Sequence, residues 1–452
     1  MKVVSARRYA ILLVTIFAAA ITIACGGDDE SEGGDGGARG ETFGFGLGAI
    51  TLASDGLADR VSAMQFAPDG RLFYTEQLEG TIRILNADGT PAAEPFAQIT
   101  VADWAGQDWG LTGLALDPGF ATNGYVYAFY TEPVTPGDIN ASPAVNPTGR
   151  PTIIRFTDQG GVGVEQTTID ADFPETNPGQ AGFNANGEIH FGPDGKLYAS
   201  IGDYDLFSID PGIITDPSSP VGKILRLNPD GTPPADNPFI DDPAADPRVF
   251  ATGFREPFPF TFAGDGTVYG TDNTTVSCEE LNVLKSGLYY GWPEMGVFPF
   301  PDCSVAPGEQ PIYNMARDGM APGDFVSLVE VSGLSQLTGS TYTQLSDGLL
   351  ICESRKSADA SGQPTIGVLK RMTLSSPTTV DTYDQVSSDC FGEVRTRAGE
   401  AYYATQGAIR KLVEESEGET AAPETDSPEG TDAPEETDAP DEPQETVAVP
   451  VP

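Results

Sequence analysis

The chain has 452 residues, with 67 Asp and Glu side chains against only 24 Lys and Arg, so its formal net charge is −43 at pH 7. This acidity excludes nucleic acid as an expected partner, because contacts to phosphates need a basic surface. His190 is the only histidine. Zinc centres built from several histidines are therefore excluded, and we expect His190 to be structural.

The first 24 residues have the pattern of an export signal. A basic start at 2–8 precedes an apolar stretch at 9–24, which is short for a membrane-spanning helix. The stretch ends at Ala24-Cys25-Gly26, which resembles a bacterial lipoprotein cleavage site. We expect acyl chains on Cys25 to anchor an exported protein to the outer face of the cell membrane or in the periplasm. A plain signal peptide is the alternative.

Both ends of the chain have compositions that do not predict a packed core. Residues 25–44 are rich in Gly, Asp, Glu and Ser and are expected to form a flexible tether. Residues 414–452 contain no aromatic and no basic side chain, which predicts a disordered acidic tail. The folded domain is therefore expected at 45–413.

Within this domain, a unit made of a strand, a tight turn and a second strand recurs six times. Four of the units turn at Asp-Gly, with the aspartates at 69, 194, 265 and 347. Glycine takes a positive φ without steric penalty, and the flanking aromatic and β-branched runs indicate strands. The sequence predicts an all-β fold, a six-bladed β-propeller of four-stranded antiparallel blades. A pair of large β-sandwiches is the alternative.

The chain contains five cysteines. If Cys25 is lipidated, four remain, an even number that predicts disulfides in an exported protein. Four cysteines allow three connectivities. Proximity in the sequence favours Cys278–Cys303 and Cys352–Cys390, each within a blade or between neighbouring blades.

Over most of residues 50–412 the chain resembles the PQQ-dependent aldose sugar dehydrogenases, the glucose/sorbosone dehydrogenase family. The matching blocks follow one another in the family's order at 66–76, 107–127, 222–227, 236–239, 252–257, 279–284 and 290–293. The family oxidises aldose sugars at C1 with a histidine as general base, PQQ as hydride acceptor and calcium to polarise the quinone. The resemblance implies PQQ and calcium as cofactors, and a small sugar or a cell-surface glycan as partner.

The resemblance also assigns roles to residues of this chain. Gln107 matches a glutamine near the substrate, Arg255 matches an arginine that contacts the quinone, and Lys356 matches a lysine that pairs with cofactor carboxylates. Glu280 and Tyr290 match the positions that hold a structural calcium, one by its carboxylate and one by its backbone carbonyl. A loop tie is the alternative role for Arg255, and a solvated charge is the alternative for Lys356.

Several family residues are replaced in this chain. The catalytic histidine falls on Asn184, and an amide cannot serve as a general base. The aspartate beside it falls on Phe183, and the family's paired arginines before the last turn are represented only by Arg395 and Arg397, out of register. The sequence therefore predicts a sugar dehydrogenase-like lipoprotein that is divergent or inactive.

Two other functions remain open. One is a non-catalytic propeller at the cell surface that binds a glycan or a protein. The other, less favoured, is a calcium-dependent lactonase-like hydrolase with carboxylates such as Glu188, Asp203 and Asp205 at the axis. The sequence does not tell the oligomeric state.

Overall fold

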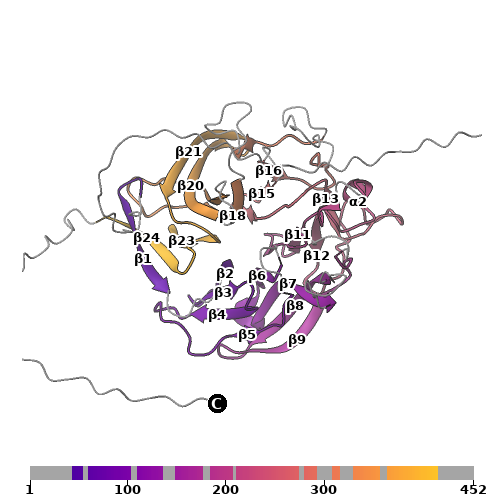
Figure 1. The fold of residues 1–452 in the computed structure, drawn as a ribbon, viewed down its shortest axis with the longest axis horizontal. Helices are drawn as coiled ribbons and strands as arrows, with labels where there is room; N and C mark the ends of the chain where they lie inside the picture. Colours follow the sequence, from indigo (N-terminus) through magenta and orange to yellow (C-terminus); the bar gives the residue numbers. More distant parts are fainter. Residues whose placement is uncertain are drawn as a thin grey trace, which may run out of the picture. The chain divides into compact units, whose positions relative to one another are not determined.

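The structure is a computed structural model that describes residues 43–53, 60–102, 109–135, 148–176, 184–206, 210–273, 279–292, 308–315, 329–356 and 364–415. The strands in these segments form six four-stranded antiparallel sheets, arranged as blades around a ring (Figure 1). The predicted six-bladed propeller is therefore confirmed, and the pair of β-sandwiches is not what forms.

Each blade uses four strands that are consecutive in the sequence, except the sixth, which borrows the first strand of the chain. Blade 1 consists of β2 (Val61–Phe66), β3 (Leu72–Glu76), β4 (Thr81–Leu85) and β5 (Ala97–Gln98). Blade 2 consists of β6 (Leu111–Leu116), β7 (Tyr125–Thr135), β8 (Thr148–Asp158) and β9 (Gly163–Asp170). Blade 3 consists of β10 (Ile189–Phe191), β11 (Leu197–Ile201), β12 (Lys223–Leu227) and β13 (Val249–Thr252). Blade 4 consists of β14 (Phe260–Phe262), β15 (Val268–Asp272), β16 (Glu280–Leu284) and β17 (Tyr313–Asn314). Blade 5 consists of β18 (Val329–Leu337), β19 (Gly348–Lys356), β20 (Pro364–Ser376) and β21 (Thr379–Ser387). Blade 6 consists of β22 (Val394–Arg397), β23 (Glu400–Ala404), β24 (Ile409–Glu414) and β1 (Leu47–Ala53).

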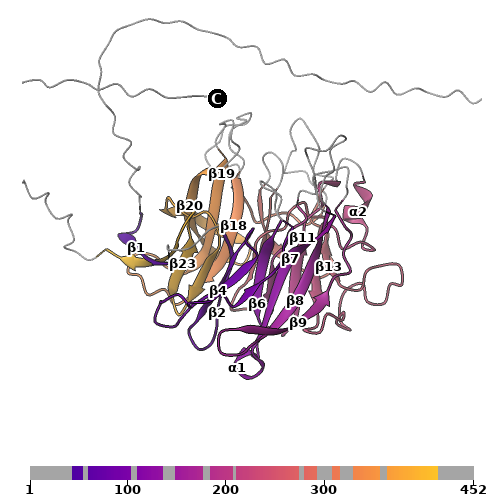
Figure 2. The ribbon, with the colours of Figure 1, turned by 60° about the horizontal axis from the view of Figure 1, so that its bottom comes forward.

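The first strand of each blade lies nearest the axis of the ring. β2 contacts β6 and β22, β6 contacts β10, and β18 contacts β14 and β22. Figure 2 shows the long strands of blades 2 and 5 running across the thickness of the ring. Side chains at the start of these inner strands therefore meet at one mouth of the axis, and side chains near the first turns meet at the other.

The Asp-Gly turns form as the sequence indicated. Asp69 and Asp194 each accept a hydrogen bond from the backbone N–H two residues later, both over 3.1 Å. The glycines that follow, Gly70 and Gly195, have φ values of 99° and 70°. This left-handed backbone is open to glycine without steric penalty.

Blade 5 departs from the predicted pattern. Its first strand is β18, so the expectation that residues just before Asp347 form a strand was wrong. The carboxylate of Asp347 accepts hydrogen bonds from the N–H groups of Gly339 and Ser340 at 2.9 and 2.7 Å. Asp347 thus closes a longer loop instead of a tight hairpin turn.

The apolar core is divided among the spaces between blades. Six clusters of buried side chains each join two neighbouring blades. Phe73 of blade 1, for example, packs edge-on against Phe96 and, across the interface, Phe120. Burying a side chain of this size contributes roughly 1.5–3 kcal/mol, so each blade is stabilised chiefly by its neighbours.

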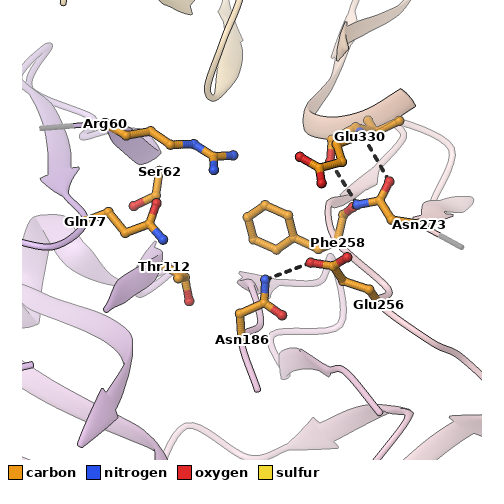
Figure 3. A pocket seen from close by; sticks show the side chains of 10 residues that line it. Arg60, Ser62, Gln77, Thr112, Asn186, Glu256, Phe258, Asn273 and Glu330 are labelled. Atoms are coloured by element: carbon orange, nitrogen blue, oxygen red, sulfur yellow. Dashed lines mark hydrogen bonds between the residues drawn. The ribbon is translucent and has the colours of Figure 1, made fainter. Parts of the chain in front are cut away.

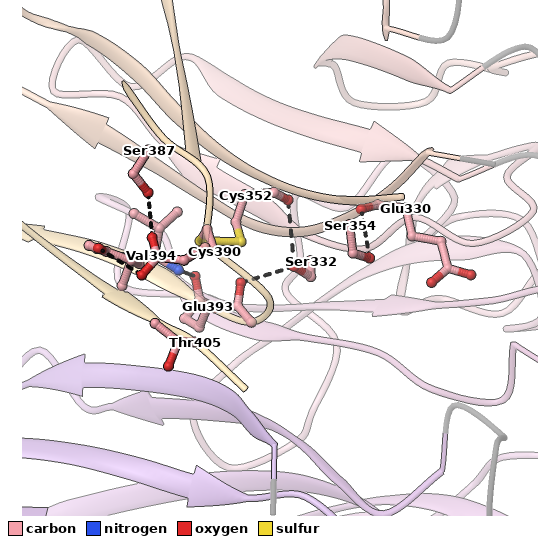
Figure 4. Close-up of a disulfide and its surroundings, with 12 residues drawn as sticks. Glu330, Ser332, Cys352, Ser354, Ser387, Cys390, Glu393, Val394 and Thr405 are labelled. Carbon is pink, nitrogen blue, oxygen red and sulfur yellow. Dashed lines mark hydrogen bonds between the residues drawn. A yellow bond between two sulfur atoms is a disulfide. The ribbon is translucent and has the colours of Figure 1, made fainter. Parts of the chain in front are cut away.

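The ring closes in blade 6. β1 pairs antiparallel with β24, with Leu47 opposite Glu414. The Cys352–Cys390 disulfide, whose Cα atoms are 5.5 Å apart, joins β19 of blade 5 to the segment before β22 (Figure 4). Sequence proximity had favoured this pair.

Several sequence-based expectations lie outside the described residues. They are the signal segment at 1–24, the lipidated Cys25, the tether up to residue 42, the tail beyond residue 415, and the Cys278–Cys303 pair. In the part of the chain that the structure describes, no helix is long and apolar enough to cross a membrane. The two helices there, α1 (Phe120–Asn123) and α2 (Gly212–Thr215), have four residues each.

Candidate functional site

A polar pocket lies at one mouth of the axis, where the inner strands begin. It is lined by Arg60, Ser62, Gln77, Thr112, Asn186, Glu256, Phe258, Asn273, Glu330 and Val331. In Figure 3, Arg60 and Gln77 approach from one side and Glu256 and Glu330 from the other, with the Phe258 ring projecting between them. We call this the axial pocket. It has a positive charge on one wall and two carboxylates on the opposite wall.

Hydrogen bonds between blades hold part of this lining in place. Ser62 Oγ of blade 1 donates to the Leu111 carbonyl of blade 2 over 2.6 Å. Thr112 Oγ1 of blade 2 donates to the Gly187 carbonyl, which precedes the first strand of blade 3, over 2.7 Å. The mouth of the axis is therefore a rigid surface, because three blades fix one another's positions there.

Asn184, the position of the family's base, is buried in a left-handed turn with a φ of 56°. Its Nδ2 donates to Asp203 Oδ1 over 2.8 Å, and Trp292 Nε1 donates to Asp203 Oδ2 over 2.9 Å. Burial raises the pKa of Asp203, although Arg255 and the two donors oppose the rise. The amide of Asn184 acts here as a hydrogen-bond donor to a carboxylate, and it has no group that takes up a proton at neutral pH.

The sequence analysis gave Asp203 a role only in the lactonase alternative and missed it as the partner of Asn184. The signal was Gly202, directly before it. A Cβ at Gly202 would lie 2.1 Å from the Asn184 carbonyl oxygen, so only glycine allows the two segments to approach this closely. The neighbouring Phe183 lies outside the described residues.

Arg255 lies between the axial pocket and blade 4. Its backbone N–H contacts both carboxylate oxygens of Asp272 at 3.1 Å. Its Nη1 donates to the Asn273 carbonyl over 2.8 Å and lies 3.6 Å from Glu256 Oε2. The guanidinium thus makes the loop tie that was the structural alternative for this residue.

Three carboxylates are buried together at the end of β15 and the start of β16. Burial raises the pKa of Asp272 to about 7, that of Glu279 to about 8 and that of Glu280 to about 9, and repulsion from neighbouring carboxylates adds to each rise. Buried like charges of this kind favour a bound cation, because otherwise the carboxylates must take up protons.

The oxygens near Glu280 suit such a cation. Glu280 lies opposite Asn314 on β17, and Asn282 is on the same face of β16 as Glu280. Glu280 Oε1, Asn282 Oδ1 and Asn314 Oδ1 are all buried and find no hydrogen-bond partner in the described part of the chain. Unsatisfied oxygens on rigid strands are the ligands that calcium prefers, so these residues fit the ion.

Tyr290, the other predicted calcium residue, is held beside the same strand. Its hydroxyl donates to the Val283 carbonyl of β16 over 2.8 Å, and its ring stacks on Phe254. Among the described residues, no three Asp, Glu, His or Cys side chains converge as a metal site. Amide and backbone oxygens would therefore have to supply most of the ligands.

Below the axial pocket, four ionisable side chains cross the axis. Arg395 of blade 6 reaches Glu188 beside blade 3, with Nη2 2.8 Å from Oε1, and the same Nη2 lies 2.9 Å from His190 Nε2. Glu393 Oε2 lies 3.4 Å from this Nη2. We call these four residues the axial plug. All four side chains are buried.

Burial shifts the pKa values of two members of the axial plug towards their neutral forms. It raises the pKa of Glu393 well above its usual value, against the attraction of Arg395. It also lowers the pKa of His190, against the attraction of Glu188 and with help from Arg395. Glu188 and Arg395 form the ion pair of the axial plug.

His190 belongs to the axial plug and lies away from the axial pocket. It faces a separate hollow on the other side of the axial plug, which it lines with Phe191, Pro193 and Phe262 among others. The axial pocket does not include it. Arg397 donates from Nη1 to the Gly70 carbonyl, so neither this arginine nor Arg395 in the axial plug lines the axial pocket.

Two predicted site residues remain without a structural account. Gln107 lies outside the described residues, as does the side chain of Lys356, whose backbone ends β19 opposite Pro364.

Comparison with known proteins identifies the family. A sequence model described as Glucose / Sorbosone dehydrogenase matches residues 59–357. The chain belongs to the glucose/sorbosone dehydrogenase family. Its resemblance to the family is therefore confirmed.

The curated proteins that are similar to this chain differ from it at most positions. It is 27% identical to quinoprotein glucose dehydrogenase B of Acinetobacter calcoaceticus over 62% of this chain and 60% of that protein. It is 30% identical to an uncharacterised protein of Synechocystis, over 51% of this chain and 55% of that one. It is also 30% identical to mouse Hedgehog-interacting protein, over 45% of this chain and 30% of that one. The chain thus spans little more than half the length of the first two relatives.

Solved structures share the fold. A putative glucose dehydrogenase from Thermus thermophilus superposes with a TM-score of 0.61 at 25% identity, covering 81% of this chain and 100% of that one. The PQQ-bound aldose sugar dehydrogenase of Streptomyces coelicolor superposes with a TM-score of 0.58 at 20% identity, covering 82% of this chain and 97% of that one.

Proposed function

We propose that this member of the glucose/sorbosone dehydrogenase family binds a sugar in its axial pocket and oxidises aldose sugars through PQQ slowly or not at all. The observation that carries the proposal is the hydrogen bond from Asn184 Nδ2 to Asp203. An amide donor stands where the family has its base. General-base catalysis typically contributes ~10²–10⁴-fold in rate, so its loss alone removes most of the activity.

The described residues do not fit PQQ, a quinone that carries several carboxylates. The axial pocket presents Glu256 and Glu330 against Arg60, and like charges in a partly buried site repel strongly. Arg395, near the position of the family's paired arginines, is held in the axial plug by Glu188. We therefore derive no reaction step through the quinone.

A sugar fits the same lining better. Amide, carboxylate and guanidinium groups from Gln77, Asn186, Glu330 and Arg60 offer both donors and acceptors for hydroxyl groups, and Phe258 offers an apolar face. Ligand pockets commonly combine an apolar surface with a few fixed polar groups. The Hedgehog-interacting relatives support a binding role without catalysis.

Calcium belongs to the proposal as a structural ion. Glu280, Asn282, Asn314 and the backbone of Tyr290 would hold it. The ion would neutralise the buried carboxylates beside Asp272. The Asp272 carboxylate accepts hydrogen bonds from the backbone N–H groups of Arg255 and Glu256 and so positions their loop. Its expected effect is on the stability of one wall of the axial pocket.

The location of the protein is proposed from the sequence alone. Lipidation at Cys25 would anchor the propeller outside the cell, where a small sugar or a surface glycan is available. The intact mass of membrane-extracted protein should show added acyl chains. A mass equal to that of the unmodified chain would refute the anchor.

The proposed function is tested by measuring binding and turnover separately. Calorimetric titration with D-glucose should show binding that is weakened in Arg60→Gln and unchanged in Glu165→Gln, an exposed charge on β9. Dye reduction with added PQQ, calcium and glucose should be slow or absent. Brisk turnover by the wild type would refute the assignment, and binding that is unaffected by Arg60→Gln would move the sugar out of the axial pocket.

A further inference from the structure

We infer that the axial pocket selects a sugar that carries an ammonium group, an amino sugar, over a neutral sugar of the same size. This inference rests on the proposed binding of a sugar in the axial pocket. It concerns the wall formed by Asn186, Glu256 and Glu330.

The first observation is an unsatisfied acceptor. Asn186 is 5% exposed and lines the axial pocket. Its Nδ2 donates to Glu256 Oε1 over 3.1 Å, whereas its Oδ1 is buried and has no hydrogen-bond partner among the residues that the structure describes. The Nδ2 bond fixes the orientation of the amide, so Oδ1 remains as an acceptor for a donor on a ligand. Leaving such a group unpaired costs about 1–3 kcal/mol.

The second observation is the charge of the same wall. Glu256 lines the axial pocket with a carboxylate that already accepts the Asn186 amide. Glu330 adds another from the start of β18. An ammonium group has three N–H donors and no acceptor. It is therefore matched to a wall that offers two carboxylates and an amide oxygen.

The wall is held in place before a ligand arrives. Asn273 donates from Nδ2 to the carbonyls of Phe258 and Val331 at 3.0 and 3.2 Å, and its Oδ1 accepts from the Val331 N–H at 3.0 Å. This residue fastens β18 to the segment before β14. The backbone next to Glu330 and the Phe258 ring are thereby fixed, so a ligand need not order them.

A sugar also suits the opposite wall better than a bare divalent cation does. The Arg60 guanidinium points into the axial pocket (Figure 3). Arginine only donates hydrogen bonds, so it matches the ring and hydroxyl oxygens of a sugar and repels a metal ion. Calcium would need six to eight oxygen ligands, more than Asn186, Glu256 and Glu330 are arranged to give.

The inference is tested with three sugars at a mildly acidic pH, at which a sugar amine is protonated. Calorimetric titration with D-glucosamine should give a Kd at least about tenfold lower than that for D-glucose, because charge-assisted hydrogen bonds are roughly twice as strong as neutral ones. N-acetyl-D-glucosamine, which lacks the charge, should lose this advantage. Glu330→Gln and Asn186→Ala should each weaken the binding of D-glucosamine more than that of D-glucose, so that the ratio of the two Kd values falls towards one. Glu165→Gln should change neither Kd.

The outcomes separate this inference from the proposed function. Equal affinities for glucosamine and glucose, with glucose binding still weakened by Arg60→Gln, would overturn the inference alone. If no sugar binds, both fail. Calcium chloride that binds the wild type and displaces glucosamine would assign this wall to a metal ion and also overturn the inference. If Glu330→Gln lowers the melting temperature markedly, the ratio of the two Kd values in Asn186→Ala decides, because that variant removes the Oδ1 acceptor together with the Nδ2 bond to Glu256.

Discussion

Replacing Arg395 is expected to lower the free energy of unfolding strongly, because its guanidinium neutralises the fully buried carboxylate of Glu188. Its Nη2 lies 2.8 Å from Glu188 Oε1, and it also donates to the carbonyls of Met64 and Leu334. These contacts connect four blades across the axis. In Arg395→Met the apolar stem is kept, but the buried carboxylate of Glu188 loses its guanidinium and keeps His190 Nε2, 2.7 Å away, and the Phe260 N–H as partners. Breaking a buried pair in this way costs about 3–5 kcal/mol of unfolding free energy at neutral pH.

The loss should depend on pH. Burial alone would raise the pKa of Glu188, but His190 and Arg395 lower it to about 2. A carboxyl with a depressed pKa contributes stability above its unfolded value, ~4.3, and this contribution is lost as the pH falls towards 2. In Arg395→Met the pKa of Glu188 should rise, so the carboxyl takes up a proton in acid and no longer needs a cation. The difference between wild type and variant should therefore shrink as the pH falls below about 5.

Urea denaturation, followed by circular dichroism from neutral to acid pH, measures both effects. Arg395→Met should lower the midpoint with little change in slope. The double variant Glu188→Gln/Arg395→Met should recover most of the loss, since no buried charge remains. Arg397→Met, the same change two residues along β22 at an exposed side chain, is the control and should cost less than about 1 kcal/mol. A single variant that matches this control, or a double variant without recovery, would refute the reasoning.

Three further predictions concern activity and stability. Asn184→His should leave PQQ-dependent dye reduction slow or absent, because histidine tolerates the left-handed turn at φ 56° but does not remove the carboxylates of Glu256 and Glu330 that oppose the quinone; brisk dye reduction by this variant would show that the missing base alone limits turnover. Calcium should raise the melting temperature after chelator treatment, by the equivalent of about 2.7 kcal/mol at a hundredfold excess over Kd, and an equal shift in Glu280→Gln would contradict the assigned site. Replacing Cys352 and Cys390 by serine should lower the unfolding free energy by roughly 3–4 kcal/mol, because the disulfide closes a loop with a sequence separation of 38. A loss below about 1 kcal/mol in denaturant unfolding would show that closure of this loop does not stabilise the protein to that extent.

The fold was predictable because it depends on local signals. Blades 1, 3 and 4 each have an Asp-Gly turn between their first two strands, as at Asp69-Gly70. The aspartate accepts a hydrogen bond from the residue only two positions later, so the signal is local. Blade 5 was predicted incompletely because Asp347 bonds back to Ser340, seven residues away. Once a turn grows to that length, its residues no longer reveal where the preceding strand ends.

The candidate site was predictable only where family resemblance assigned a position. Asn184 was found in this way, but its bond to Asp203 depends on the pairing of two segments around β10 and β11. The contact between Arg395 and Glu188 joins residues 207 positions apart, and no local pattern encodes it. The buried oxygens of Glu280 and Asn314 likewise meet only because β16 pairs with β17.

The pairing of β1 with β24 determines when folding can finish. Every other blade is complete as soon as its own four strands are available, whereas Leu47 must wait for a partner at Glu414. Bringing such distant strands together carries the largest loop-closure entropy in the chain, and contacts of this separation form slowly. A chain that stops before residue 409 lacks β24, so β1 has no partner and the apolar side chains of blade 6 that pack on β24 are left uncovered and prone to aggregation. Closure of the ring therefore depends on the last strand, since only a chain translated to that point can become a closed propeller.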